Sequence, residues 1–551
     1  MSTLRSLCLI GVMSAGGLAC NESTRAPAPT ASTTDLSGRT ETPTPPAPVP
    51  DAPAPAPDAP APTPTPPRVV EQPLPAPMPV PAPAPVEEPP PPRYSREWFV
   101  SPSGSDTAQG TRQKPLRSIS KALTLVGPGE IVRVQAGTYA EKLALDTRVK
   151  AGTAAAPITL RGEGNPRLVP ISSGWFMVHV QRPHWRIEGF ELDVRGQRQV
   201  AVTFSGDTEG TVLANSHLHH GAFGSGISTD SGARGVTIQD NHIHHFARGS
   251  EDSHGVVIAP TSRDITVRGN DIHDNSGDSV QCLGPEGFSH NTPARGVLIE
   301  DNHMHDNREN AVDIKTCHDV TVRRNRMHGF VKSSTSRGEA LVVHYSAKNI
   351  LVEDNDISSS SLGVAVGGNR VGAPPTNVSV RRNRIHGLRM PEGSAIRIEN
   401  GSDVRVLHNT ITGTAGFALV LGHGTGGDST HVVVRNNLIA TRNAVNLGPH
   451  APGLRMESNV YLPGAGFATG RFFIPSESWV GDTLATWQAA GRDVGSKARA
   501  DALADAVDFT PGSGAVDQGM DLGLPYCGTA PDVGAVESAC LAPTATAALT
   551  E

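Results

Sequence analysis

The sequence is poor in aromatic residues, in charge and in cysteine. Phe, Tyr and Trp make up 4% of the 551 residues, and the four charged types make up 18%. The net charge is −7 and no basic stretch is interleaved with aromatics, which argues against nucleic-acid binding. The six cysteines form no CxxC pair and no Cys/His set with zinc-site spacing. After the first 20 residues, no apolar run is long enough to span a bilayer.

The N-terminal part carries an export signal followed by a low-complexity segment. Residues 1–19 are positively charged at Arg5 and then apolar, and they resemble a bacterial lipoprotein signal with a lipid anchor at Cys20. Plain secretion is the alternative. Residues 20–93 are mostly Pro and Ala, which predicts a disordered spacer, and residues 542–551 are predicted to be a disordered tail. We therefore expect an exported protein, secreted or held at a bacterial outer membrane through the anchor.

A repeat dominates the rest of the chain. Segments such as VTIQDNHIH and VLIEDNHMH recur with an Asn at a fixed place, at Asn241, Asn270, Asn302, Asn325, Asn355, Asn383, Asn409 and Asn437. Successive Asn lie 23 to 32 residues apart, which indicates stacked units, and the apolar alternation indicates strands. The repeat predicts a solenoid of about twelve coils over residues 94–541, with three short strands in each. The Asn row is predicted to be structural, stacked at a turn where Asn tolerates left-handed backbone.

This pattern resembles the right-handed parallel β-helix of the pectate-lyase-like superfamily, over residues 96–540. The segment PLRSISKALTLV (115–126) looks like the amphipathic helix that covers the first coil in such proteins. The segments DFTPGSGAVDQG (508–519) and PDVGAVE (531–537) are similar to their closing region. The resemblance implies an all-β fold. It does not decide the function, because this scaffold carries lyases, hydrolases, epimerases and adhesins.

Polar residues interrupt the mostly apolar pattern of the strand that follows each Asn unit. In VQCL, VDIK, LVVH and IRIE, the first and third residues are expected to point inward and the second and fourth outward. The outward positions hold Gln281, Asp313, Lys315, His344, Arg397 and Glu399, with Asp278 and Glu339 just upstream. Equivalent positions on neighbouring coils are mostly apolar or Gly. The chain therefore predicts a local polar cluster centred near Lys315.

Such a cluster suits β-elimination on a uronate-containing polysaccharide. The reaction needs a base that takes the C5 proton, a positive charge beside the carboxylate and a proton donor for the leaving oxygen. Lys315 is the candidate base and His344 the acid or a sugar-binding group, and Asp313 is the third candidate catalytic residue. Gln281, Arg397, Glu399 and Glu339 are the candidate substrate-binding residues.

The segment NAVDIK (310–315) is similar to the one that carries the catalytic Lys in family 9 polysaccharide lyases. Those enzymes use Ca²⁺, and Asp278, Asp313 and Glu309 are the candidate ligands here. An acidic polysaccharide is the expected partner, and the protein is expected to be a monomer. Two alternatives stay open: Lys315 is simply solvated or paired with Asp313, or the protein is a non-catalytic glycan-binding or adhesin-like surface protein.

Cysteine and histidine complete the set of candidates. Cys527 and Cys540 are predicted to pair, and Cys282 and Cys317 fall on successive coils, where spacing alone does not show pairing. A histidine recurs three residues after the Asn position, at His219, His244, His273, His305, His328 and His386. We interpret this row as an outward polar ladder rather than a metal-binding strip.

Overall fold

The computed structural model describes residues 93–171, 174–230, 232–283, 292–368, 372–424, 426–462 and 471–540. The predicted signal, the Cys20 anchor, nearly all of the spacer and the C-terminal tail lie outside these residues. Among the described helices, none is both long and apolar enough to cross a bilayer.

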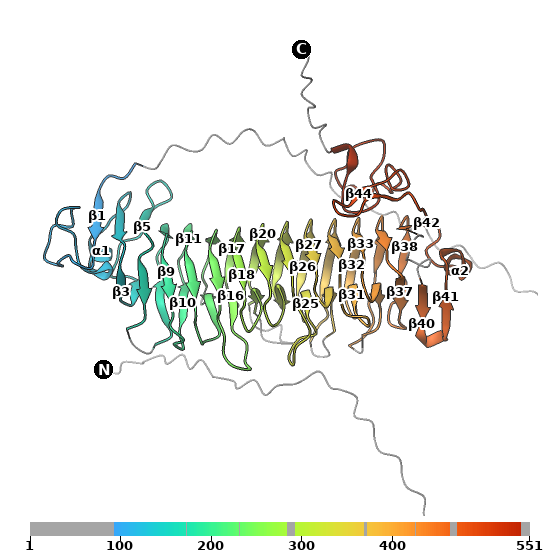
Figure 1. Ribbon diagram of the computed structural model, residues 1–551, viewed down its shortest axis with the longest axis horizontal. Coiled ribbons are helices and arrows are strands. Elements are labelled where there is room, and N and C mark those ends of the chain that lie inside the picture. Colours follow the sequence, from blue (N-terminus) through green and yellow to red (C-terminus); the bar gives the residue numbers. More distant parts are fainter. Residues whose placement is uncertain are drawn as a thin grey trace, which may run out of the picture. The chain divides into compact units, whose positions relative to one another are not determined.

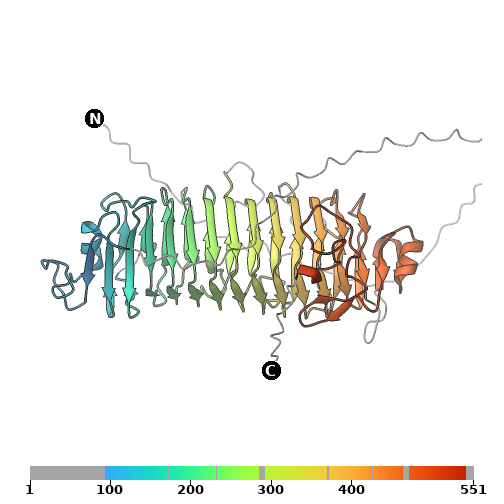
Figure 2. The same cartoon turned by 90° about the horizontal axis from the view of Figure 1, so that it is seen from above.

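The described chain forms a parallel β-helix, as the repeat predicts. Apart from the two ends, each coil contributes one strand to each of three 14-stranded sheets that extend along the solenoid (Figures 1 and 2). The strands pair in parallel, except that the last strand of the third sheet pairs antiparallel with its neighbour. Sheet A consists of β1 (Glu97–Val100), β2 (Ile131–Gln135), β5 (Ile158–Glu163), β8 (Trp185–Glu188), β11 (Thr211–Ala214), β14 (Val236–Gln239), β17 (Arg263–Arg268), β20 (Arg295–Glu300), β23 (His318–Arg323), β26 (Lys348–Glu353), β29 (Thr376–Arg381), β32 (Ser402–Leu407), β35 (Val433–Arg435) and β38 (Arg455–Glu457).

The other two sheets follow the same order along the chain. Sheet B consists of β3 (Thr138–Ala140), β6 (Arg167–Val169), β9 (Glu191–Asp193), β12 (His217–His219), β15 (His242–His244), β18 (Asp271–His273), β21 (His303–His305), β24 (Arg326–His328), β27 (Asp356–Ser358), β30 (Arg384–His386), β33 (Thr410–Thr412), β36 (Leu438–Ala440), β39 (Val460–Tyr461) and β42 (Lys497–Ala498). Sheet C consists of β4 (Leu143–Leu145), β7 (Phe176–Val180), β10 (Val200–Ser205), β13 (Ser225–Asp230), β16 (His254–Ile258), β19 (Val280–Cys282), β22 (Val312–Lys315), β25 (Glu339–His344), β28 (Leu362–Val366), β31 (Ser394–Ile398), β34 (Phe417–Leu421), β37 (Asn443–Leu447), β40 (Arg471–Ile474) and β41 (Trp479–Gly481).

The remaining elements lie at the two ends. Helix α1 (Ile119–Leu125) contacts β1, β2 and β4, and its Ile119, Ala122 and Leu123 are buried in the main core. Near the other end are a 3-10 turn (Pro475–Glu477), α2 (Leu484–Ala489), the antiparallel pair β43 (Leu503–Asp505) and β44 (Thr510–Pro511), and a 3-10 turn at Ser538–Cys540.

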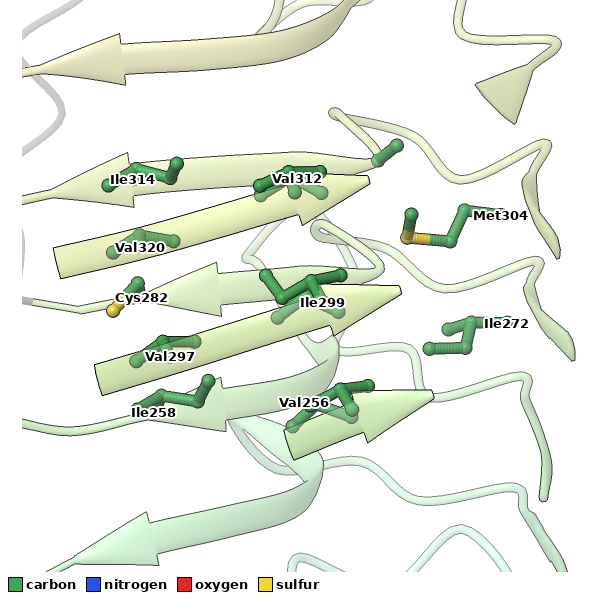
Figure 3. Close-up of a cluster of buried hydrophobic side chains, with 14 of the residues drawn as sticks. Val256, Ile258, Ile272, Cys282, Val297, Ile299, Met304, Val312, Ile314 and Val320 are labelled. Atoms are coloured by element: carbon green, nitrogen blue, oxygen red, sulfur yellow. The ribbon is translucent and has the colours of Figure 1, made fainter. Parts of the chain in front are cut away.

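The core is a set of inward apolar columns. In sheet C, Val256, Val280, Val312 and Leu341 occupy one register position on successive strands and are all fully buried. Figure 3 shows such side chains filling the interior from strands of all three sheets. The inward and outward assignment made from the sequence is confirmed in these strands.

The Asn row is a continuous hydrogen-bonded ladder. Each side-chain carbonyl accepts from the backbone N–H and the Nδ2 of the preceding Asn, at 2.9–3.1 Å from Asn241 to Asn459. Each Nδ2 also donates to a backbone carbonyl of the previous coil, as Asn355 does to Val322 at 3.0 Å. The ladder satisfies backbone groups that the turn would otherwise leave buried without partners.

The left-handed backbone lies one residue earlier than the sequence analysis placed it. The residue before the ladder Asn has the positive φ, 54° at Asp240, 58° at Asp301 and 57° at Asp354. The Asn itself has an ordinary φ, because its amide must point along the stack to reach the next coil.

Two disulfides are present in the part of the chain that the structure describes. Cys282 at the end of β19 is bonded to Cys317, which follows β22 on the next coil, and Cys527 is bonded to Cys540.

Candidate active site

Asp313, Lys315 and His344 form one contacting group on the outer face of sheet C. Alternation along β22 turns Asp313 and Lys315 outward, and parallel pairing sets His344 of β25 beside Lys315. The Asp313 Oδ1 lies 2.7 Å from His344 Nε2, and Asp313 Oδ2 lies 3.4 Å from Lys315 Nζ. We refer to these three residues as the Asp313 cluster.

Asp313 is buried and ionised. Burial alone would raise its pKa, but the charges and hydrogen bonds of Lys315 and His344 outweigh that effect and hold the pKa of Asp313 below its usual value. A fixed negative charge therefore orients both neighbours. Lys315 is therefore paired with Asp313, one of the two arrangements that the sequence left open, and this carboxylate favours the ammonium form of Lys315.

A second network fixes the turn next to this cluster. Asp278 is fully buried, and its Oδ1 accepts from the backbone N–H and the Nδ2 of Asn310 at 3.0 and 2.8 Å. Its Oδ2 accepts from Gln281 Nε2 at 3.1 Å and lies 3.1 Å from His254 Nδ1. Gln281 is thus held by Asp278, one register step before Asp313.

The three candidate Ca²⁺ ligands do not converge. Asp278, Asp313 and Glu309 do not bring their carboxylate oxygens within 4.8 Å of one another, and Asp278 and Asp313 already bind Asn310, Gln281 and His344. Ca²⁺ takes six to eight oxygen ligands, so these residues as arranged do not fit it. Glu309 is instead protonated at neutral pH, because burial and the nearby Asp278 and Asp252 raise its pKa to about 8.

The remaining candidates form a separate group further along sheet C. Arg397 is bonded to Glu399, and Arg337 lies 3.8 Å from both Glu339 and Glu399. We call these four residues the Arg397 cluster. Burial raises the pKa of Glu339 and lowers the pKa of Arg397.

Register fixes the spacing of the two clusters. Asp313 pairs with Val342, Val342 with Ala365 and Ala365 with Arg397, so Arg397 lies three coils from Asp313, whereas Glu339 lies on β25, the strand that carries His344. Three coils correspond to about 14 Å at the usual spacing of strands.

Sequence reasoning missed Arg337. It lies in the turn before β25, outside every repeated position, so no column of the alignment contains it. The same turn contacts the Asp278 network, since Ser336 Oγ donates to Asn310 Oδ1 at 3.5 Å. Residues 284–291, between β19 and β20, lie outside the described residues.

Two hollows open elsewhere on the described surface. One is lined by Asn215, His217 and His242 among others, and the second by Asp274, Asp306 and Arg308 among others. Neither includes a residue of the Asp313 cluster.

Comparison with known families identifies the fold. A model described as "Right handed beta helix region" matches residues 187–370 and 330–462, which together span half of the chain. The chain belongs to the right-handed β-helix family. The handedness predicted from the sequence is thereby confirmed, and a model of a protein family of unknown function, DUF1565, matches residues 102–152.

Individual relatives match parts of this right-handed β-helix. Uncharacterized protein YwoF of Bacillus subtilis (strain 168) is 31% identical over 212 residues, covering 34% of this chain and 44% of that protein. Pectate lyase PEL9 of Emericella nidulans is 41% identical over 63 residues, covering 11% and 15%. The chain thus spans less than half the length of the curated relatives it matches.

Solved structures are also similar to this β-helix. Pectate lyase Pel9A has a TM-score of 0.40 at 16% identity, covering 81% of this chain and 97% of that chain. A mannuronic acid specific polysaccharide family 6 lyase from human gut microbiota has a TM-score of 0.47 at 14% identity, covering 67% and 87%.

Proposed function

We propose that this protein is a polysaccharide lyase that cleaves an acidic, uronate-containing chain by β-elimination. The observation that carries the proposal is the Asp313 cluster, in which a buried carboxylate holds an imidazole at 2.7 Å and an ammonium at 3.4 Å. The similarity of a short segment to pectate lyase PEL9 supports the same reaction class.

The cluster supports roles that differ from those proposed from the sequence. A base must be neutral to accept a proton, and the Asp313 carboxylate favours the charged form of both neighbours. An imidazole is nevertheless the easier of the two to obtain neutral, because an unperturbed imidazole loses its proton about four pH units below an unperturbed ammonium. We therefore assign proton abstraction to His344, oriented by Asp313, and neutralisation of the uronate carboxylate to Lys315. Asp313 is a positioning residue in this scheme.

The bond changes then balance within the substrate. His344 takes the C5 proton, the C5–H electrons form the C4–C5 double bond, and the bond from C4 to the glycosidic oxygen breaks. That oxygen takes a proton from His344 or from water. No step in this scheme requires Ca²⁺. A requirement for Ca²⁺ stays a prediction, and assays with added Ca²⁺ and with chelator test it.

Arg397 is proposed to bind a sugar next to the reacting one, because it lies two coils beyond His344 and three beyond Asp313. An arginine released from Glu339 or Glu399 can form a bidentate pair with a uronate carboxylate. Loss of Arg397 should raise KM more than it lowers kcat.

The test is a panel of pectate, alginate and glycosaminoglycans, followed by the ultraviolet absorbance of unsaturated uronate. His344→Ala should lower kcat roughly 10²–10⁴-fold, the usual contribution of a positioned base. Val257→Ala, an outward residue of β16 in the same sheet, is the matched control and should keep full activity. Folding of each variant is checked by its thermal transition.

Lys315→Arg distinguishes a Lys315 that neutralises the uronate carboxylate from a Lys315 that acts as the base. An arginine keeps the positive charge but does not act as a base near neutral pH. If Lys315 neutralises the carboxylate, the variant retains measurable activity. If Lys315 is the base, the variant is as inactive as Lys315→Ala.

A non-catalytic glycan-binding protein is the second candidate. It is favoured by the internal pairing of both clusters, which leaves each charge matched without a substrate. Binding of an acidic polysaccharide with no unsaturated product in any condition would establish it.

Export and surface attachment are part of the proposal. The apolar N-terminus, the Cys20 position and the two disulfides support an oxidising compartment outside the cytoplasm. Cys20→Ser should release an otherwise membrane-associated protein into the soluble fraction, and unchanged fractionation would contradict the anchor.

A further inference from the structure

The outer face of sheet B carries two adjacent columns of imidazoles. The second column is the row predicted from the sequence, where rings of successive coils stack with centroids 4.7–5.5 Å apart. The first column lies one residue after the Asn position and contains His217, His242 and His303, with Glu191 and Asp271 in the same column. Together these residues form what we call the histidine face of β9 to β24.

The two columns meet along diagonals between coils. Nε2 of His217 lies 2.6 Å from Nε2 of His244, and Nε2 of His242 lies 2.7 Å from Nε2 of His273. His303 repeats this contact with His328 at 2.8 Å. Each diagonal contact brings two imidazole nitrogens close to one point, an arrangement that ring stacking by itself does not require.

Four sets of three ligand atoms lie on this face, three of them with one carboxylate and one made of imidazoles alone. In each of four sets, the ligand atoms all lie within 4.8 Å of one another: Asp193, His219 and His220; His217, His242 and His244; His242, Asp271 and His273; Asp271, His303 and His305. In the last set, Asp271 Oδ1 lies 3.3 Å from His303 Nδ1 and 3.2 Å from His305 Nε2.

These spacings match a tetrahedral ion. Two ligands bound at about 2.0–2.1 Å to Zn²⁺ lie about 3.3–3.4 Å apart. The Asp271 set already has that spacing, and the imidazole diagonals reach it if their rings separate by about 0.6 Å. Three protein ligands leave a fourth position for water. The side chains of Asp271 and His303 are 46% and 38% exposed, so an ion has access from solvent.

The chemistry of the ligands selects the class of ion. Imidazole with one carboxylate suits Zn²⁺, Cu²⁺ and Ni²⁺, whereas Ca²⁺ and Mg²⁺ require oxygen ligands. Burial and neighbouring imidazoles lower the pKa of His217, His242 and His303, and lower the pKa of His244 to about 3, which keeps their lone pairs available.

We propose that the histidine face binds divalent transition-metal ions of the Zn²⁺ class at several overlapping sites. The overlaps set the stoichiometry. His242 is shared by two sets and Asp271 by two, while the set of Asp193 is independent. Up to three ions bind at once, through the sets of Asp193, His217 and His303. The proposal is independent of lyase activity, because the Asp313 cluster lies on sheet C.

The test measures metal bound to the full mature chain without a histidine tag. After incubation with Zn²⁺ and gel filtration, elemental analysis should find up to three ions per chain, and Ca²⁺ or Mg²⁺ should not be retained. The double variant His242→Gln with Asp271→Asn removes three of the four sets, so retained Zn²⁺ should fall to about one ion.

The matched control keeps the histidine face intact. Asp356→Asn with His386→Gln removes an isolated pair, 3.1 Å apart, on β27 and β30 of the same sheet. This control should bind as much Zn²⁺ as the unmodified chain. The thermal transition of each metal-free variant verifies folding. Equal retention by both double variants, or no Zn²⁺ retained by the unmodified chain, would overturn the proposal.

Discussion

Single residues of sheet C differ sharply in their state of ionisation. Asp313 is ionised within its ion pairs, whereas Glu309, a few residues earlier, is protonated near neutral pH because burial and the nearby Asp278 and Asp252 oppose its charge. One carboxyl therefore orders the candidate catalytic groups, and the other adds a pH dependence to folding.

Glu309→Gln tests that difference. Below pH 4.5 Glu309 is protonated in both the folded and the unfolded chain. Between pH 4.5 and about 8 only the unfolded chain releases the proton. The contribution of Glu309 to stability is therefore full at low pH and is lost as pH rises towards 8. The variant should be more stable than the unmodified chain at pH 8.5, by on the order of 5 kcal/mol, and within about 1 kcal/mol of it at pH 5. Thermal unfolding across this pH range measures the difference.

Glu392→Gln, at an exposed turn, is the control for this titration and should show no such trend. A constant difference between the Glu309 variant and the unmodified chain at all pH values would contradict the raised pKa.

The residue scale also marks a limit of prediction. Outward placement of Asp313, Lys315 and His344 follows from alternation, and their mutual contact follows from register. The chemical roles of these three residues do not follow from the sequence. The charge on Lys315 depends on its distance from Asp313, and only the structure gives that distance. Arg337 was not predicted as a site residue because turns vary in length between coils, and an alignment of strands does not include them.

At the scale of elements, the Asn ladder joins every coil from β14 to β38. Asn355 is almost fully buried and connects Asn325, Val322 and Asn383 through its side chain. Asn355→Ala leaves the backbone N–H of Asn325 buried without an acceptor, whereas the Nδ2 of Asn325 keeps the carbonyls of Ile299 and Arg323. We expect a loss of about 1–3 kcal/mol in the free energy of unfolding.

Denaturant unfolding checks this expectation against Ser379→Ala, an outward half-buried position on β29, which should change stability by less than about 0.5 kcal/mol. Equal effects at both positions would show that the ladder is dispensable.

The elements show why one histidine column was found and the other was not. The row three residues after Asn was visible as a repeat, but the row one residue after Asn is interrupted by Asp271 and Arg326. Their diagonal contacts depend on the lateral distance between columns, which a one-dimensional period does not show.

At the scale of the whole molecule, a C-terminal segment covers part of sheet B. Leu438 and Val460 are buried there against Ala515 and Val533, and Ala535 donates its backbone N–H to Thr410. The closing segments noted in the sequence belong to this contact. The outward positions of β36 are apolar because they are covered.

Val533→Asp should weaken this contact, since it buries a carboxylate in an apolar cluster. Limited proteolysis should then cleave within residues 499–540 while the coils before residue 462 stay resistant. Val507→Asp, the same substitution at a position that is 83% exposed in the same segment, is the control. Equal protease resistance of both variants would contradict a docked segment.

The central claim is that sheet C carries a β-eliminating site. The most direct measurement is mass spectrometry of the fragments released from pectate, alginate and glycosaminoglycans by the unmodified chain and by His344→Ala. The account predicts fragments with an unsaturated end, lighter by one water than hydrolysis products, which disappear in the variant while Val257→Ala still releases them. Fragments with saturated ends, or unsaturated fragments released equally by His344→Ala, would contradict it.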